Sequence, residues 1–278
     1  MKRKNRILAT LLTLPLYAFT LVFVLGPLCY MVVLSFMTPA EHWGVEKIFT
    51  LKNYLDILNP TYLSTFGQSF KLAIISTSAV ILLGYPFGLC IAMSKKRTQK
   101  FLITMQMIPY WVNSLIRLYG WIIVFRANGL LDRLLMALRI TSEPLRLLYT
   151  YPAVVVGMIY VLLPFMVISV YSIAEKLDLT LVEASRDLGA GKIQSFFSVI
   201  LPMTLPGLLT GVVLTFIPSM GLFFIASILG GNKVVLVGSL IEEQLMKVHN
   251  EPFAAALSVV LTLLTALIIG LTKIKKHR

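Results

Sequence analysis

Residues Leu147–Ala174 read LLYTYPAVVVGMIYVLLPFMVISVYSIA and contain no Asp, Glu, Lys or Arg. An α-helix needs about 20 residues to cross the hydrocarbon core of a bilayer, and this run is longer. Helices on the surface of a soluble protein alternate apolar and polar residues with the helical period, and this stretch does not. It therefore predicts a membrane-spanning helix.

The composition of the whole chain supports this interpretation. Of its 278 residues, 58 % are hydrophobic and 13 % are charged, whereas soluble domains carry about a quarter charged residues. A soluble globule of this length has no interior large enough to hide so much apolar surface. Disordered chains are poor in apolar residues, so that class is excluded as well.

Similar apolar runs recur along the chain, and each is long enough to cross a bilayer. We predict an all-α membrane protein whose single permease domain, residues 1–278, has six transmembrane helices. The predicted spans are residues 7–36, 72–94, 101–125, 149–174, 199–229 and 252–272.

Basic residues between the spans predict the orientation. The N-terminus, the turn after the second span, the segment after the fourth span and the C-terminal tail together hold 15 basic and four acidic residues. The other three loops hold eight of each. Because Lys and Arg are enriched in cytoplasmic loops, we expect both termini to be cytoplasmic.

Residues 175–198 form the cytoplasmic segment between the fourth and fifth predicted spans. Thr180 and Glu183 have the spacing of a capping box, which predicts a helix that starts near Leu181. Gly189 lies where such a helix would end in a left-handed conformation. A second helix should then run from Lys192 into the fifth span. Residues at helical spacing should line one face of the first helix, namely Leu181, Ala184, Ser185 and Leu188.

The order Glu183-Ala184-Ser185, Gly189 and Leu201-Pro202 resembles the EAA motif of ABC-importer permeases. Ser185 stands in place of the second Ala of that motif. The resemblance implies the type I, MetI-like permease fold, in which this segment is the coupling helix that binds a separate cytoplasmic ATPase. The docking residues that it implies are Glu183, Ala184, Ser185, Asp187 and Gly189.

Other stretches resemble the polyamine branch of this family: Ile108–Trp121, Leu162–Met166, Glu175–Asp178 and Pro218–Phe224. The resemblance implies a non-catalytic subunit of a spermidine/putrescine importer in the bacterial inner membrane. It implies four kinds of partner: a second homologous permease, two ATPase subunits that use ATP-Mg, an external solute-binding protein and membrane lipid. We expect no cofactor, metal or nucleic acid on this chain.

No Asp or Glu lies within a predicted span, so carboxylates of the spans cannot bind a polycation here. Aromatic faces can attract ammonium groups, and they can equally form an interfacial belt or ordinary packing. Arg117 is the one charge well inside a span, and we expect it to pair with backbone carbonyls or a neighbouring helix, or to reach the interface. The proposed pathway residues are Tyr110, Trp111, Asn113, Tyr160, Phe223 and Phe224.

Two alternatives remain for the function. An importer permease of the same class could carry ferric iron, sulfate or molybdate, and a stand-alone ion-driven transporter would need no ATPase. Leu188–Lys192 superficially suggests a phosphate loop, but Arg186 stands where that loop needs its first Gly and Ile193 where it needs Ser or Thr. The three histidines lie outside the spans without the spacing of metal ligands.

Overall fold

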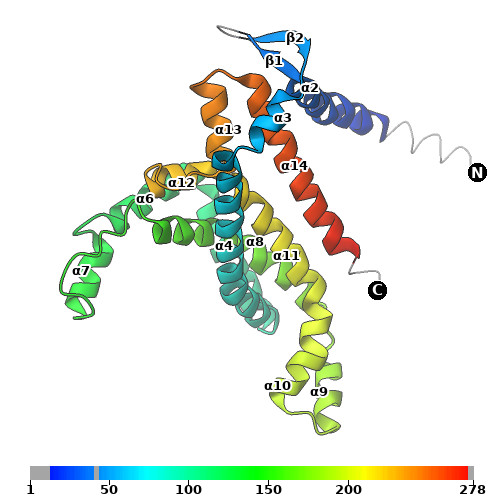
Figure 1. Ribbon diagram of the computed structural model, residues 1–278. Coiled ribbons are helices and arrows are strands. Elements are labelled where there is room, and N and C mark those ends of the chain that lie inside the picture. The colour runs from blue at the N-terminus through cyan, green and yellow to red at the C-terminus, as the bar shows by residue number, and fades with distance from the viewer. Residues whose placement is uncertain (1–12, 41–43, 275–278) are drawn as a thin grey trace, which may run out of the picture. The chain divides into compact units, whose positions relative to one another are not determined.

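The computed structural model describes residues 13–40 and 44–274, and it is mostly helical (Figure 1). The basic N-terminus, residues 7–12 of the first predicted span and the end of the basic tail lie outside the described residues. The chain divides into two compact units. Unit 1 comprises residues 1–63 and 240–266, and unit 2 comprises residues 64–239 and 267–278.

Unit 1 begins with the helix Thr13–Ser35, which includes the π-helical turn η1 (Thr20–Leu25) and α2 (Gly26–Ser35). The strands β1 (Met37–Pro39) and β2 (Val45–Phe49) then pair antiparallel, an element that the all-α prediction lacked. The buried Asn53 amide explains where this hairpin forms, because it donates to Ser35 O (3.0 Å) and Met37 O (2.9 Å). The remaining elements are α3 (Lys52–Ile57) and part of α14 (Glu251–Ile274).

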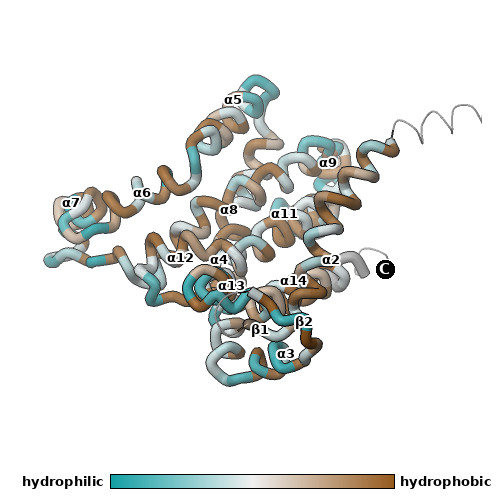
Figure 2. The backbone as a smooth tube through the Cα atoms, turned by 90° about the horizontal axis from the view of Figure 1, so that it is seen from above, coloured by the Kyte–Doolittle hydropathy of each residue, from teal (hydrophilic) through white to brown (hydrophobic). Residues whose placement is uncertain are grey.

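Unit 2 holds most of α4 (Pro60–Ala92) and the elements that follow it. Figure 2 shows the apolar character of α8 and the polar first turn of α5. Helix α13 (Val237–Met246) begins in unit 2 and continues in unit 1. The elements between α4 and α13 are α5 (Lys96–Met107), η2 (Ile108–Trp111), α6 (Ser114–Phe125), α7 (Leu130–Ala137), α8 (Tyr151–Ala174), α9 (Leu179–Asp187), α10 (Lys192–Ser195), η3 (Phe196–Ile200), α11 (Leu201–Gly221) and α12 (Phe223–Gly230).

Among the described residues, five helices are long and apolar enough to cross a membrane: Thr13–Ser35, Pro60–Ala92, Tyr151–Ala174, Lys192–Gly221 and Glu251–Gly270. A sixth span would be a bent pair, Lys96–Trp111 with Ser114–Ala137, whose helices meet at 93°. The sequence predicts one continuous span over 101–125, and the bend divides it into two helices. Likewise, the predicted span 199–229 is interrupted at Leu222 (ψ 61°).

Glycines allow the close packing of α4 and α11 against α8. A Cβ added at Gly88 would lie 3.0 Å from the carbonyl oxygen of Val167, and one added at Gly207 would lie 2.8 Å from that of Ser169. The buried Tyr85 and Thr204 hydroxyls, 2.7 Å apart, also join α4 to α11. Small residues let helix backbones approach closely in a bilayer, where apolar burial alone gives little attraction between helices.

We predict that Gly207→Ala destabilises the protein by about 1–3 kcal/mol, because the added methyl would press on backbone that cannot rotate away. The matched control is Gly120→Ala on α6, where an added Cβ meets nothing within 4 Å. Thermal unfolding of the purified variants in detergent measures the effect. Equal midpoints for the two variants would contradict the role given to Gly207.

Candidate functional site: the coupling segment and the bent aromatic span

The helix predicted to start near Leu181 begins two residues earlier, because Asp178 rather than Thr180 is its N-cap. Asp178 Oδ1 accepts from the Thr180 backbone N–H (3.0 Å) and from the Thr180 hydroxyl (2.8 Å). These hydrogen bonds lower the pKa of Asp178 below its usual value. The predicted capping box is therefore wrong: the Thr180 hydroxyl is occupied by Asp178, and a carboxylate is also better suited to the positive end of a helix.

The C-terminus of α9 has the predicted left-handed glycine. Gly189 has φ +90°, its N–H donates to Arg186 O (2.8 Å), and the Ala190 N–H donates to Ser185 O (3.1 Å). This hydrogen-bond pattern is a Schellman motif, which ends the helix and turns the chain toward α10. Figure 1 shows α9 and α10 side by side at one end of α11.

The inner face of α9 packs on α10 through a pair of serines. Ser185 Oγ lies 2.8 Å from Ser195 Oγ, and Ser195 is 1 % exposed. Val182 is buried beside them. From the sequence, Ser185 is simply a replacement for the second Ala of the motif, and no local pattern pairs it with Ser195, ten positions further on.

The outer face of α9 is exposed. Of the four residues expected to share a face, Ser185 is partly buried toward α10, whereas Leu181, Ala184 and Leu188 are exposed, Leu188 at 89 %. Glu183 and Asp187 are exposed beside them. Short helices whose leucines stay open next to carboxylates are suited to insertion into a groove on a partner.

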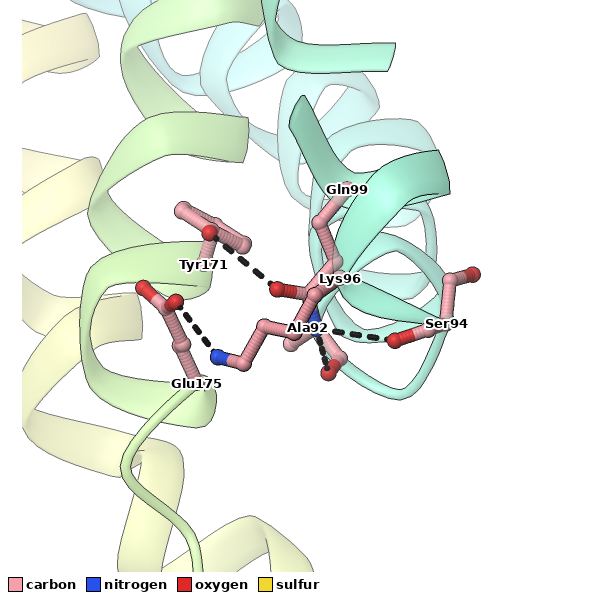
Figure 3. Close-up of polar contacts among 6 residues, drawn as sticks. All are labelled: Ala92, Ser94, Lys96, Gln99, Tyr171 and Glu175. Carbon is pink, nitrogen blue, oxygen red and sulfur yellow. Dashed lines mark hydrogen bonds and ion pairs between the residues drawn. The ribbon is translucent and has the colours of Figure 1, made fainter. Parts of the chain in front are cut away.

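Polar contacts connect the start of this segment to the turn between α4 and α5 (Figure 3). Lys96 Nζ lies 2.8 Å from Glu175 Oε1. Gln99, 4 % exposed, donates to Ala92 O (2.7 Å) and Ser94 O (2.9 Å) at the end of α4. The Tyr171 hydroxyl of α8 donates to Gln99 Oε1 at 3.5 Å. The α4–α5 turn and the end of α8 are thus joined, and α9 follows this end of α8 in the chain.

The Lys96 ammonium holds the pKa of Glu175 below its usual value. A lowered carboxyl pKa means that the ion pair is present at neutral pH and is lost as the pH falls through that lowered pKa. The Lys96 side chain is 72 % exposed, so water screens the pair. The buried Gln99 amide, which has no signal in the sequence, holds the α4–α5 turn through two short hydrogen bonds and reaches α8 through the longer Tyr171 contact.

The second predicted site lies on the bent span. η2 is a 3₁₀ turn that contains Pro109, and the Asn113 side chain then caps α6 by accepting from the Leu115 N–H (2.8 Å). A new helix start after a proline turn accounts for the 93° bend. Trp111 at the bend is 83 % exposed.

Two of the predicted pathway residues meet at Arg117. The Arg117 guanidinium carbon lies 4.3 Å from the ring centroid of Tyr110 and 5.5 Å from that of Tyr160. Of the alternatives expected for Arg117, pairing with a neighbouring helix is the one observed, because Tyr160 lies on α8 and the contacts found among the described residues are with aromatic faces. The Phe223 and Phe224 rings contact each other at 6.4 Å, and no ring contact among the described residues joins them to Tyr110 or Tyr160.

Among the residues that the structure describes, no group of three or more His, Cys, Asp or Glu could hold a metal ion. Buried or partly buried polar groups of unit 2 include tyrosine rings, hydroxyls, the Arg117 guanidinium and the Asp132 carboxylate, which accepts from the Asn128 and Leu145 N–H groups. These groups can bind and orient a charged solute. The exposed face of α9 can bind a partner.

We predict that Asp178→Ala frays the first turn of α9, because the Thr180 amide loses its acceptor, whereas Asp178→Asn keeps it. Amide hydrogen exchange at Thr180 and Leu181 should accelerate several-fold in the alanine variant alone. Glu183→Ala is the control, because it removes the N3 side chain that a capping box would need, and it should leave exchange unchanged. Faster exchange in the Glu183 variant, with none in Asp178→Ala, would restore the capping box.

Comparison with known proteins agrees with this geometry. Residues 84–276 match the family model "Binding-protein-dependent transport system inner membrane component". The chain is 40 % identical over 247 residues to the spermidine/putrescine transport system permease protein PotB of Escherichia coli (strain K12), covering 89 % of this chain and 90 % of that protein.

Two solved structures share the fold. One is a bacterial ABC transporter involved in the import of alginate (TM-score 0.73, 15 % identity, covering 100 % of this chain and 96 % of that chain). The other is the MetNI methionine ABC transporter (TM-score 0.55, 21 % identity, covering 76 % of this chain and 92 % of that chain). They confirm the predicted ABC-importer permease fold. The chain is a multi-pass, non-catalytic transport subunit of the inner membrane, and it belongs to the family of binding-protein-dependent transport system inner membrane components.

Proposed function

We propose that this chain is a permease subunit of an ATP-driven importer of polyamines, spermidine and putrescine. The assignment of polyamines as the cargo rests on the 40 % identity to a spermidine/putrescine permease over 89 % of the chain. The assembly would contain a second homologous permease, two cytoplasmic ATPase subunits that use ATP-Mg and an external solute-binding protein. In this arrangement both termini face the cytoplasm.

The exposed face of α9 supports ATPase docking. Leu181, Ala184 and Leu188 offer apolar contacts with no partner in the described chain, while Glu183 and Asp187 offer charge. The left-handed Gly189 and the Ser185–Ser195 contact hold this face in place. The docking residues in this proposal are Glu183, Ala184, Ser185, Asp187 and Gly189.

Movement of α9 would reach the spans through two contacts. Ser185 joins α9 to the helix that continues into α11, and Glu175 and Gln99 join the end of α8 to the α4–α5 turn. When the ATPases close on ATP, they would draw the two coupling segments of the assembly together. The spans would then shift between two packings, from inward-open to outward-open.

The pathway in this proposal is lined by aromatic faces that exchange cation–π contacts with the ammonium groups of the cargo. Each such contact is worth about 0.5–2 kcal/mol. The lining residues that we propose are Tyr110, Trp111, Asn113, Tyr160, Phe223 and Phe224. Asn113 also caps α6, so its amide oxygen serves the bend as well.

We predict that cells whose uptake of labelled spermidine depends on this chain lose that signal to excess unlabelled spermidine or putrescine. Ferric iron, sulfate and molybdate should not compete, because ring faces give these ions no matching charge or ligand. Competition by one of them, without competition by polyamines, would assign the cargo to that ion. Uptake that persists without any ATPase would favour the ion-driven transporter.

We predict that Glu183→Arg lowers both ATPase co-purification and uptake at least about tenfold. The substitution puts a positive side chain where the proposed interface has a negative one, so attraction across the interface becomes repulsion. The matched control is Glu243→Arg, an exposed glutamate on α13 far along the chain, which should keep ATPase binding. If the Glu183 variant binds the ATPase and transports normally, α9 is not the docking helix.

A further inference from the structure

Arg117 is held by rings from two different elements. It lies on α6 just after the bend, Tyr110 belongs to η2, and Tyr160 belongs to α8. The guanidinium carbon is 4.3 Å and 5.5 Å from the two ring centroids. Both distances are within the range of an attractive cation–π contact.

The two rings are themselves fixed by their surroundings. The Tyr110 hydroxyl donates to Val161 O on α8, and the Tyr110 ring meets Phe165 edge-on at 6.1 Å. Trp121 of α6 contacts the Tyr160 ring edge-on at 5.5 Å. The aromatic faces would therefore stay in place if the cation between them were exchanged.

No carboxylate balances the Arg117 charge. Its Nε and Nη1 are buried and have no hydrogen-bond partner in the described part of the chain. The ion pair found among the described residues joins Lys96 to Glu175 instead. A partly buried cation without a counter-ion is costly, and the two ring faces stabilise this charge. Ring faces of this kind attract ammonium groups as well as guanidinium groups.

We propose that Arg117 occupies a binding site for an alkylammonium group, and that an ammonium group of the cargo replaces its guanidinium on Tyr110 and Tyr160 during transport. This inference rests on the proposed function, since it takes the cargo to be a polycation. Two cations cannot share these rings, because like charges a few ångströms apart repel strongly where water is scarce. When the cargo leaves, the tethered guanidinium refills the site and opposes its return.

The test is equilibrium binding of labelled spermidine to the assembled transporter in lipid nanodiscs, with the external binding protein left out. Arg117→Gln frees the rings, so spermidine should bind about tenfold more tightly than to the wild type. Arg117→Lys keeps a cation and should bind as the wild type does. Adding Tyr160→Leu to Arg117→Gln should remove the gain.

Arg126→Gln is the matched control, because Arg126 is an exposed arginine at the end of α6 and should leave binding unchanged. Thermal midpoints of all variants show that each is folded. If Arg117→Gln is folded and binds spermidine no more tightly than the wild type, the exchange does not occur. Spermidine uptake by the wild type distinguishes failure of the exchange from failure of the proposed function. If the wild type takes up spermidine but Arg117→Gln binds it no more tightly, only the exchange is overturned. If the wild type takes up no spermidine, the proposed function is overturned.

Discussion

The close contact of α8 with α4 and α11 is the constraint on which the rest of unit 2 depends. Lipid tails are as apolar as leucine, so helices in a bilayer associate through tight van der Waals packing at small residues. Carbonyl oxygens of Val167 and Ser169 leave space only for the hydrogens of Gly88 and Gly207. Because α8 is held on two sides, its ends become fixed points: Glu175 contacts Lys96 at one end, and the Tyr149 N–H before the other end donates to Leu229 O.

In the proposed importer, these contacts would link the coupling segment to the spans. α9 is capped by Asp178, ended by Gly189 and joined through Ser185 to the helix that becomes α11. Its buried face is small, and its leucines remain exposed. A partner that binds those leucines would therefore move α11 and the end of α8 together, because the tightly packed contacts between these helices shift as units rather than deform.

The bent span contains polar side chains, among them Asn113 and Arg117, whose burial in a membrane costs free energy. Pro109 and Asn113 were visible in the sequence, and proline within an apolar run signals a possible bend. The 93° angle was not predictable, because it depends on a new cap and on the support of α8. The partners of Arg117 were also missed. Tyr110 and Tyr160 stand seven residues before it and 43 after it, and no local pattern connects a cation to rings so distant.

Sequence alone was enough to predict a helical membrane protein whose segment between two spans resembles the EAA motif of ABC-importer permeases. Bilayer length, hydropathy, loop charge and the EAA spacing are local properties that add along the chain. Four features emerge only in the folded chain: the exposed face of α9, the Ser185–Ser195 contact, the hydrogen bonds of Gln99 at the end of α4, and the rings around Arg117. Those outcomes depend on packing between residues far apart in sequence, where many pairings satisfy the same hydropathy and steric fit selects one.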